Sequence, residues 1–291
     1  LSARGYREAI TYSFVDPKLQ RVFDPDITPV ALTNPISADM AVMRTSLLPG
    51  LVSAVLRNVN RQQPRVRLFE TGLRFVPEAE GLQQVPTLAM VATGQRFAES
   101  WSQTSVAGDY FDLKGDLESL LALTRRAGSF DFTATQRAAL HPGQTASISQ
   151  SGREVGYIGA LHPVVVTDTG LNEPLYVAEI DLNVALDGLL PGYTELSKFP
   201  EVRRDLAVVV DKTVPGMELM QCVRNAAGPY LTDLRLFDVY EGKGIDPKRK
   251  SLALGLTFRD QSRTLSVEDV NTAIDQVVDL LGKNYKAELR N

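Results

Sequence analysis

Three side chains near the end of the chain have the chemistry to hold an unpaired nucleic-acid base: Tyr240, Ser251 and Arg290. A tyrosine ring is a flat surface on which a base stacks, an interaction worth about 1–3 kcal/mol per base. A serine hydroxyl hydrogen-bonds with a base edge, and an arginine stacks on a base or pairs with a phosphate. The residue types therefore fit a platform for single-stranded nucleic acid, provided that the fold places them on one surface.

Four basic residues lie between Tyr240 and Ser251 in the sequence: Lys243, Lys248, Arg249 and Lys250. Cations at the rim of a binding surface attract phosphates and release their counterions. Four cations, set against Glu241 and Asp246, are nevertheless a small electrostatic footprint. The residues alone also allow a simpler interpretation, a surface tyrosine beside a solvated charged loop.

Six predicted elements would bring these side chains together. Periodicity predicts strands at 205–211, 231–240, 251–258 and 285–290, and helices at 215–227 and 266–282. Ser266 and Asp269 have the spacing of a capping box at the start of the second helix. The order βαββαβ is ferredoxin-like, and in that fold both helices cover one face of the sheet and leave the other face open.

Alternation along the strands predicts which side chains reach the open face. In the third strand, the small and polar positions face away from the helices: Ser251, Ala253, Gly255 and Thr257. In the second strand, we expect Phe237 and Val239 to face the helices and Tyr240 to face away from them. The open face would then carry Tyr240 and Ser251, joined by Arg290 from the last strand.

The charge is unevenly distributed along the chain. The net charge of −4 over 291 residues argues against a nucleic-acid-binding protein. However, Ser197 to Asn291 has a net charge of +1, and Leu1 to Leu196 has a net charge of −5. Since the change falls beside the turn-rich segment 187–192, we expect two domains, 1–195 and 196–291.

The first domain alternates between helical and strand patterns. We expect helices beginning at Ser46 and near Leu113, and strands at 65–69, 88–93, 130–135, 145–150, 153–160 and 175–182. Ser151-Gly152, between two of these strands, predicts a tight hairpin. Strands next to strands, with helices between the groups, predict an α+β fold on a mostly antiparallel sheet.

No cluster in the first domain has the spacing of an enzyme site. His141 and His162 each precede proline, and neither has a metal-ligating partner three or four residues away, so we interpret both as turn residues. The sequence contains no nucleophile elbow, Walker A loop or dinucleotide fingerprint. Residues of this domain therefore predict neither a metal site nor a catalytic centre.

The composition is that of a globular chain, with 44% hydrophobic and 23% charged residues, which excludes a disordered or fibrous protein. Apolar runs such as 206–210 are far shorter than the roughly 20 residues that span a bilayer. The single cysteine, Cys222, cannot form an internal disulfide, and we expect it to be a buried apolar residue. The chain starts at Leu1 without a signal-peptide pattern, and we expect a piece of a longer cytoplasmic protein.

Several segments of the first domain form an ordered series: Asn34-Pro35-Ile36-Ser37, Met43-Arg44-Thr45-Ser46-Leu47-Leu48-Pro49-Gly50-Leu51, Asn60-Arg61, Leu68-Phe69-Glu70-Thr71-Gly72, Phe111-Asp112-Leu113-Lys114-Gly115-Asp116-Leu117-Glu118 and Leu140-His141-Pro142-Gly143-Gln144. The series resembles the catalytic-like region of the bacterial phenylalanine–tRNA ligase β subunit. That resemblance implies the fold of a class II synthetase core without its catalysis.

Two arginine motifs that class II chemistry needs for the phosphates of ATP are not found in the sequence. The segment Arg67-Leu68-Phe69-Glu70 has one residue too many for Arg-x-Glu, and no Gly-x-Gly-x-x-x-Arg motif occurs. We therefore expect Arg44, Arg67 and Glu70 to form buried ion pairs or subunit contacts. In the family that this region resembles, the ATP and phenylalanine sites belong to the α subunit.

A second series runs through the C-terminal domain: Lys198-Phe199-Pro200, Arg203-Arg204-Asp205, Phe237-Asp238-Val239-Tyr240, Lys250-Ser251-Leu252-Ala253, Arg263-Thr264-Leu265 and Leu289-Arg290. It resembles the ferredoxin-fold anticodon-binding domain that ends the same β subunit. The positions that match the contact residues of that domain are Tyr240, Ser251 and Arg290. The two resemblances together cover the chain from Gly5 to Arg290.

The resemblance implies a ligase that joins phenylalanine to its tRNA, tRNA(Phe), with ATP and Mg²⁺, as an assembly of two α and two β subunits. This chain would support the α subunit and bind the anticodon region, with no cofactor and no active site of its own. One alternative is a ferredoxin-like small-molecule regulatory module on a degenerate enzyme domain, although Gly216 behind Pro215 is a poor metabolite site. The other is a structural scaffold with no RNA contact.

Overall fold

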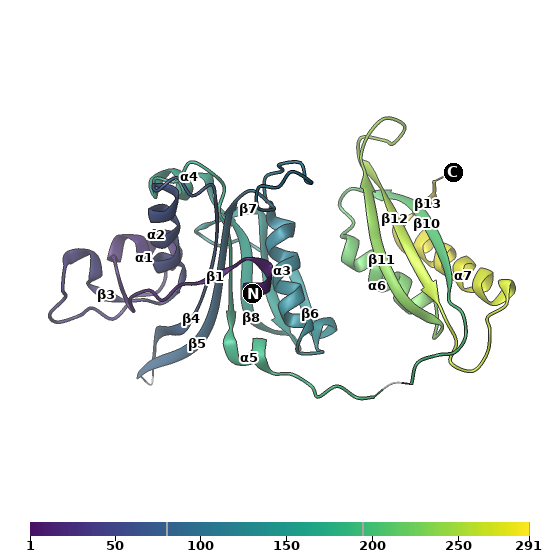
Figure 1. Cartoon of the computed structure of the whole chain (residues 1–291), viewed down its shortest axis with the longest axis horizontal. Coiled ribbons are helices and arrows are strands. Elements are labelled where there is room, and N and C mark those ends of the chain that lie inside the picture. The colour runs from purple at the N-terminus through teal and green to yellow at the C-terminus, as the bar shows by residue number, and fades with distance from the viewer. Residues whose placement is uncertain (80, 194, 291) are drawn as a thin grey trace. The chain divides into compact units, whose positions relative to one another are not determined.

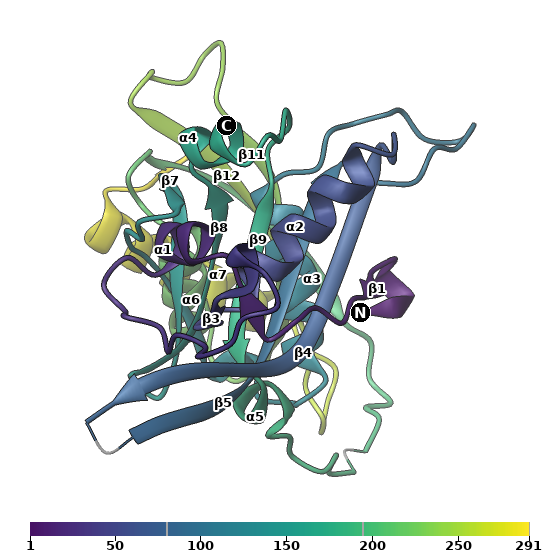
Figure 2. The ribbon, with the colours of Figure 1, turned by 90° about the vertical axis from the view of Figure 1, so that its left-hand side faces the viewer.

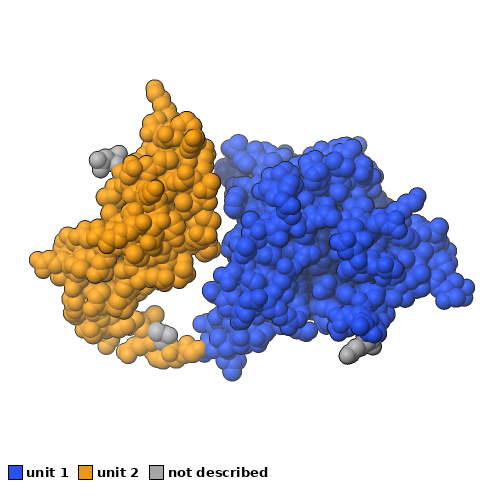
Figure 3. All heavy atoms as spheres, turned by 180° about the vertical axis from the view of Figure 1, so that it is seen from behind, with its two compact units in different colours: residues 1–191 blue, residues 192–291 orange. Residues whose placement is uncertain are grey.

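The computed structural model describes residues 1–79, 81–193 and 195–290, and the chain divides into two compact units, Leu1–Pro191 and Gly192–Asn291. Figure 3 colours the two units separately. The division falls inside the turn-rich segment 187–192. No helix of the described residues combines the length and the apolar character needed to cross a membrane.

The first unit is built on one seven-stranded sheet. Its elements are η1 (Ser2–Arg4), β1 (Arg7–Glu8), β2 (Phe14–Val15), α1 (Pro17–Phe23), η2 (Ala38–Met40), β3 (Val42–Met43), α2 (Leu48–Val59), β4 (Arg65–Glu78), β5 (Gly81–Gly94), α3 (Tyr110–Ala122), η3 (Ala127–Ser129), β6 (Phe130–Ala134), β7 (Leu140–Gln150), β8 (Arg153–Leu161), α4 (Pro163–Asp168), β9 (Tyr176–Asp181) and α5 (Leu182–Leu186). The strand order is β1-β4-β5-β9-β8-β7-β6, and only β1 and β4 pair in parallel. This confirms the α+β prediction.

Helices cover both faces of this sheet, as Figure 1 shows for α2 and α3. Leu51 and Val55 of α2 join a core with α1 and α4 on one face. Leu113, Leu117 and Leu121 of α3 join a second core on the other face. The sheet is therefore buried from both sides, which explains why its central strands are almost continuously apolar.

The β4–β5 hairpin is longer than the sequence predicted. The two strands pair without a break from Arg65 opposite Gly94 to Glu78 opposite Gly81, and Figure 2 shows the long ribbon they form. Alternation predicted only 65–69 and 88–93 because the outer half of the hairpin is largely exposed and carries little apolar signal. Backbone hydrogen bonds extend the strands beyond the part that packs on the core.

Local signals located some helix and hairpin ends correctly and others incorrectly. The Ser266–Asp269 capping box is confirmed, and Ser151 and Gly152 both adopt positive φ in the hairpin between β7 and β8. In contrast, α2 begins at Leu48, whose N–H donates to Ser46 Oγ at 3.1 Å, so Ser46 lies one residue too early to be the N-cap.

The second unit has the predicted ferredoxin-like order. Its elements are β10 (Val202–Asp211), α6 (Gly216–Ala226), β11 (Leu231–Tyr240), β12 (Arg249–Phe258), α7 (Val267–Tyr285) and β13 (Glu288–Leu289). The sheet order is β11-β12-β10-β13, with every pair antiparallel. The predicted last strand, 285–290, is too long, because α7 continues past Gly282 and ends where Lys286 turns to a left-handed φ of 50°.

Candidate nucleic-acid interface

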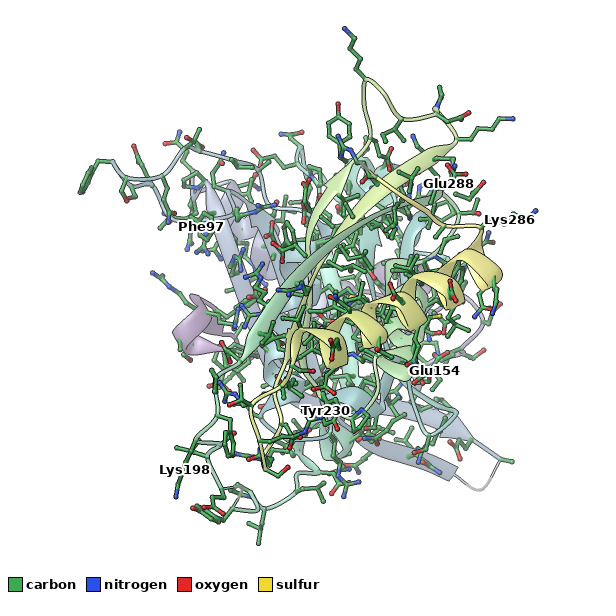
Figure 4. The ribbon with its side chains drawn as sticks, turned by 90° about the vertical axis from the view of Figure 1, so that its right-hand side faces the viewer. Phe97, Glu154, Lys198, Tyr230, Lys286 and Glu288 are labelled. Atoms are coloured by element: carbon green, nitrogen blue, oxygen red, sulfur yellow. The ribbon has the colours of Figure 1, made fainter. Side chains whose placement is uncertain are left out.

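The open face of the second unit is the sheet face opposite its two helices. Both α6 and α7 pack on the same apolar layer of the sheet, which includes Leu252, Leu254 and Leu256. Figure 4 shows α7 running across the sheet, with Lys286 at its end and Glu288 just beyond it. The strand positions that alternate with those leucines, among them Ser251 and Gly255, therefore point to the open face.

Tyr240 and Arg290 meet on this face, as the sequence predicted. The Arg290 guanidinium lies 4.7 Å from the centre of the half-buried Tyr240 ring, a cation–π contact. The Tyr240 hydroxyl donates to the carbonyl oxygen of Lys243 at 3.2 Å, which holds the ring against its own loop. The aromatic surface is thus fixed at the end of β11 and covered by an exposed arginine.

Ser251 differs from the expectation of an accessible hydroxyl, since only 2% of the residue is exposed. It lies directly opposite Tyr240 on β11 and Val209 on β10. Arg290 donates its backbone N–H to Ala207 on β10, while its guanidinium contacts the ring of Tyr240 on β11, although β10 and β12 lie between the two backbone positions. Ser251 is therefore on the predicted face, but its hydroxyl is buried rather than accessible.

The basic loop presents fewer free cations than the sequence suggested. Arg249 donates to Glu288 and to the Val209 carbonyl, each at 2.7 Å, and the Lys250 ammonium donates to the Lys212 carbonyl at 2.9 Å. Lys243 and Lys248 are exposed and make no ion pair within the described residues. Of the four predicted cations, these two lysines are therefore the ones without an internal partner among the described residues.

The prediction that Phe237 faces the helices is wrong. Strand β11 has a bulge here, because Leu236 pairs with Leu254 and Asp238 pairs with the adjacent Ala253. Phe237 is 53% exposed, and the Arg203 guanidinium lies 5.8 Å from its ring centre. An extra residue in a strand shifts the alternation, and the side-chain pattern of the sequence contains no signal of that insertion. The sequence therefore did not identify Phe237 and Arg203 as neighbours on the open face.

In the first unit, the arginines form buried ion pairs, as expected. Arg44 bonds Glu70 at 2.7 Å and Arg67 bonds Asp116 at 2.5 Å, with all four side chains less than a tenth exposed. Tyr6 also donates to Asp116, and burial raises the pKa of its hydroxyl. Cations held by carboxylates in this way cannot neutralise the phosphates of a nucleotide.

Glu179 is a buried carboxylate that the sequence did not reveal. It accepts hydrogen bonds from the Ser46 hydroxyl at 2.9 Å, the Leu47 N–H at 2.9 Å and the Tyr157 hydroxyl at 2.6 Å. Burial raises its pKa above the usual range, and burial likewise raises the pKa of Tyr157 well above its ordinary value. The network joins α2 to strands β8 and β9 and leaves no carboxylate oxygen facing solvent, so its role is structural.

The two histidines bind local backbone. The Nδ1 atom of His141 accepts from the Gly143 N–H at 3.0 Å, and that of His162 accepts from the Val164 N–H at 3.2 Å, where it caps α4. His141 lies in the irregular first part of β7 rather than in a free turn. Nowhere in residues 1–79, 81–193 and 195–290 do three or more potential ligands of the His, Cys, Asp and Glu types gather as a metal site.

These features define a class of protein: a two-unit α+β chain whose second unit is ferredoxin-like, with an aromatic–arginine platform of the kind that holds single-stranded nucleic acid. Residues 1–182 match the model of the phenylalanyl tRNA synthetase beta chain CLM domain, and residues 197–290 match the ferredoxin-fold anticodon binding domain. The chain belongs to the family of phenylalanyl tRNA synthetase beta chains.

Curated relatives support this membership along the whole chain. The phenylalanine–tRNA ligase beta subunits of Pseudomonas fluorescens and Pseudomonas syringae pathovar tomato are each 53% identical over 290 residues, covering 100% of this chain. The beta subunit of Vibrio cholerae is 45% identical over 291 residues, covering 99% of it. The chain spans 37% of the length of each of these relatives.

Proposed function

We propose that this chain is the catalytic-like and anticodon-binding part of a phenylalanine–tRNA ligase β subunit. It supports an α subunit, within an assembly of two α and two β subunits in the cytoplasm, and it binds the anticodon region of tRNA(Phe). The observation that carries the RNA-binding role is the open face of the second unit, where Arg290 contacts the ring of Tyr240, the residue opposite Ser251. The assembly assignment rests on family membership.

Residues 1–195 act in this proposal as a non-catalytic core, and residues 196–291 act as the anticodon-binding domain. The full ligase uses ATP and Mg²⁺, and this chain supplies no residue to either, because Arg44 and Arg67 are already bonded to buried carboxylates. The RNA contacts come from Tyr240, Ser251 and Arg290, with Lys243, Lys248, Arg249 and Lys250 at the rim. Arg290 must swing off the tyrosine ring before a base stacks there.

Binding of phenylalanine tRNA to the full chain, measured over a series of salt concentrations, tests the proposal. We expect weak, salt-sensitive binding, and Tyr240→Ala weakens it about tenfold because one base loses its stacking partner. Tyr12→Ala is the matched control, since Tyr12 is a 65% exposed tyrosine of the first unit. Binding that responds to neither salt nor Tyr240→Ala would contradict the RNA site.

Pyrophosphate exchange with ATP and phenylalanine tests the non-catalytic role. We expect no exchange by this chain alone and full exchange by the assembled ligase. Exchange without an α subunit would show that an active site exists in this chain.

A further inference from the structure

Two aromatic rings, each with an arginine over it, share the open face of the second unit. Arg290 lies 4.7 Å from the Tyr240 ring centre, and Arg203 lies 5.8 Å from the Phe237 ring centre. Only the first ring was expected there, because regular alternation would turn Phe237 toward the helices. The second aromatic surface results from the bulge in β11.

Two neighbours, Asp205 and Gly255, position the arginine beside the second ring. Arg203 Nε donates to Asp205 Oδ1 at 2.9 Å, which fixes the guanidinium above the sheet. A Cβ atom on Gly255 would come within 3.0 Å of Arg203 Nη2, so the glycine provides the space that the guanidinium occupies. Phe237 itself packs on neither helix and is 53% exposed. The arginine is therefore positioned by its neighbours, and the ring remains accessible.

The two rings are attached at different positions along β11. Tyr240 lies opposite Ser251 on β12, whereas the bulge at Phe237 begins beyond Ala253, two residues further along. Two residues of a strand span about 7 Å. The two backbone positions are thus far enough apart for each ring to take a different base.

We propose that Phe237, backed by Arg203, is a second base-stacking platform, and that the open face holds two unpaired bases of the bound RNA. The inference rests on the proposed function and adds a second contact to it. A four-stranded sheet whose aromatic side chains stack two or three bases is an established mode of single-strand recognition. Because every base has a π-face, this second platform contributes affinity and spacing rather than base identity.

The test uses the full chain and an anticodon stem-loop of phenylalanine tRNA that carries 2-aminopurine at one loop position at a time. Stacking on an aromatic ring quenches the fluorescence of 2-aminopurine. We expect Tyr240→Leu to remove the quench at one loop position and Phe237→Leu to remove it at a different position. Each change should weaken binding about tenfold.

Two further variants control for shape and exposure. Phe237→Tyr keeps a ring at the bulge and should retain both the affinity and the quench. Val239→Ala changes another residue of β11 with the same 53% exposure, but Val239 pairs with Leu252 of the helix-covered face and should have no effect. Thermal unfolding of all variants is measured in parallel. We expect the Phe237 variants to remain folded, because Phe237 is not part of the core.

The possible outcomes separate the inference from the proposed function. If Phe237→Leu changes neither affinity nor any quench while Tyr240→Leu changes both, the second platform is overturned and the RNA site at Tyr240 stands. Equal losses from Phe237→Leu and Phe237→Tyr would also overturn it, because a ring would then be insufficient. If neither Tyr240→Leu nor Phe237→Leu has an effect, the RNA-binding function itself is contradicted.

Discussion

The two units differ in where their polar side chains lie. Within the described part of the chain, twelve polar or charged residues are buried in the first unit, and Ser251 is the single one in the second. In the first unit, Arg44 and Arg67 are buried and bonded to carboxylates of distant segments. In the second unit, Arg203 and Arg290 lie on an exposed sheet face, over aromatic rings.

This difference separates a unit whose charges maintain its own fold from a unit whose charges remain available to a ligand. Neither partner of a buried ion pair is available to a ligand, because removing one would leave the other charged and unpaired in a medium of low polarity, which is unfavourable. A cation on an aromatic ring at the surface exchanges partners at little cost. These arginines of the two units therefore have different roles, which the total charge does not reveal.

Breaking one ion pair in each unit is the sharpest test of this contrast. Arg44–Glu70 and Arg235–Asp233 have the same N···O distance of 2.7 Å, but the first pair is buried, whereas Arg235 is 75% exposed. We expect Arg44→Ala to lower the free energy of unfolding of its unit by about 3–5 kcal/mol. Arg235→Ala should cost less than about 1 kcal/mol. Hydrogen exchange read separately for each unit measures both values, and equal costs would remove the distinction.

The buried Glu179 network should give the first unit its own response to pH. Because burial raises the pKa of Glu179, the folded state binds a proton more tightly than the unfolded state. The free energy of unfolding therefore falls as the pH rises from the usual glutamate value near 4.5 through the raised pKa. Glu179→Gln should flatten this dependence. It should also lower the free energy of unfolding by about 1–3 kcal/mol, because the amide NH2 group cannot accept the hydrogen bonds that a carboxylate oxygen accepts.

The second unit should respond with the opposite sign. Hydrogen bonds from Thr213 and Ser262 lower the pKa values of Asp211 and Asp260, so those carboxylates stabilise the fold above pH 3.8 and lose that effect as the pH falls. Denaturant unfolding at several pH values, followed by unit-resolved hydrogen exchange, measures both trends. A common pH trend in the two units would contradict the contrast.

Helix caps should be insensitive to the difference between the units, because a cap acts only on its own first turn. Asp109 caps α3 in the first unit and Ser266 caps α7 in the second, each in a capping box. We expect Ser266→Ala to cost about 1 kcal/mol. Asp109→Ala should cost at least as much, because Asp109 also bonds Arg96 at 3.1 Å. Thermal unfolding of each variant checks the values, and a cap worth nothing in one unit would show that tertiary packing alone defines that helix end.

The smallest effect is expected from the exposed lysines of the second unit. If Lys243 and Lys248 contact phosphates, Lys243→Ala and Lys248→Ala each reduce the slope of log affinity against log salt by about 0.7. Arg249→Gln should change the slope less, because Arg249 is already bonded to Glu288. Titrations with phenylalanine tRNA over a salt series measure the slopes. A larger change for Arg249 than for the lysines would mean that its internal ion pair opens on binding.

Features that depend on neighbouring residues were predictable from the sequence. The helical period of α7, its capping box at Ser266, and the Ser151-Gly152 hairpin are all set within a few residues, and all three are confirmed. The ferredoxin-like order of the second unit followed from the same local signals. Alternation along the strands predicted that Tyr240 and Arg290 share the open face, and they meet there although β11 and β13 are at opposite edges of the sheet.

The tertiary structure alone decided features that join distant segments. Arg67 bonds Asp116 49 residues away, and Ser46 bonds Glu179 133 residues away, so no window of sequence shows either pair. The bulge at Phe237 and the burial of Ser251 depend on how β11 and the C-terminal segment lie on β12 and β10. Sequence determines which side chains are able to stack, pair or cap, because these are properties of residue type and short spacing. Which of them stay free for a ligand depends on partners that only the folded chain brings within bonding distance.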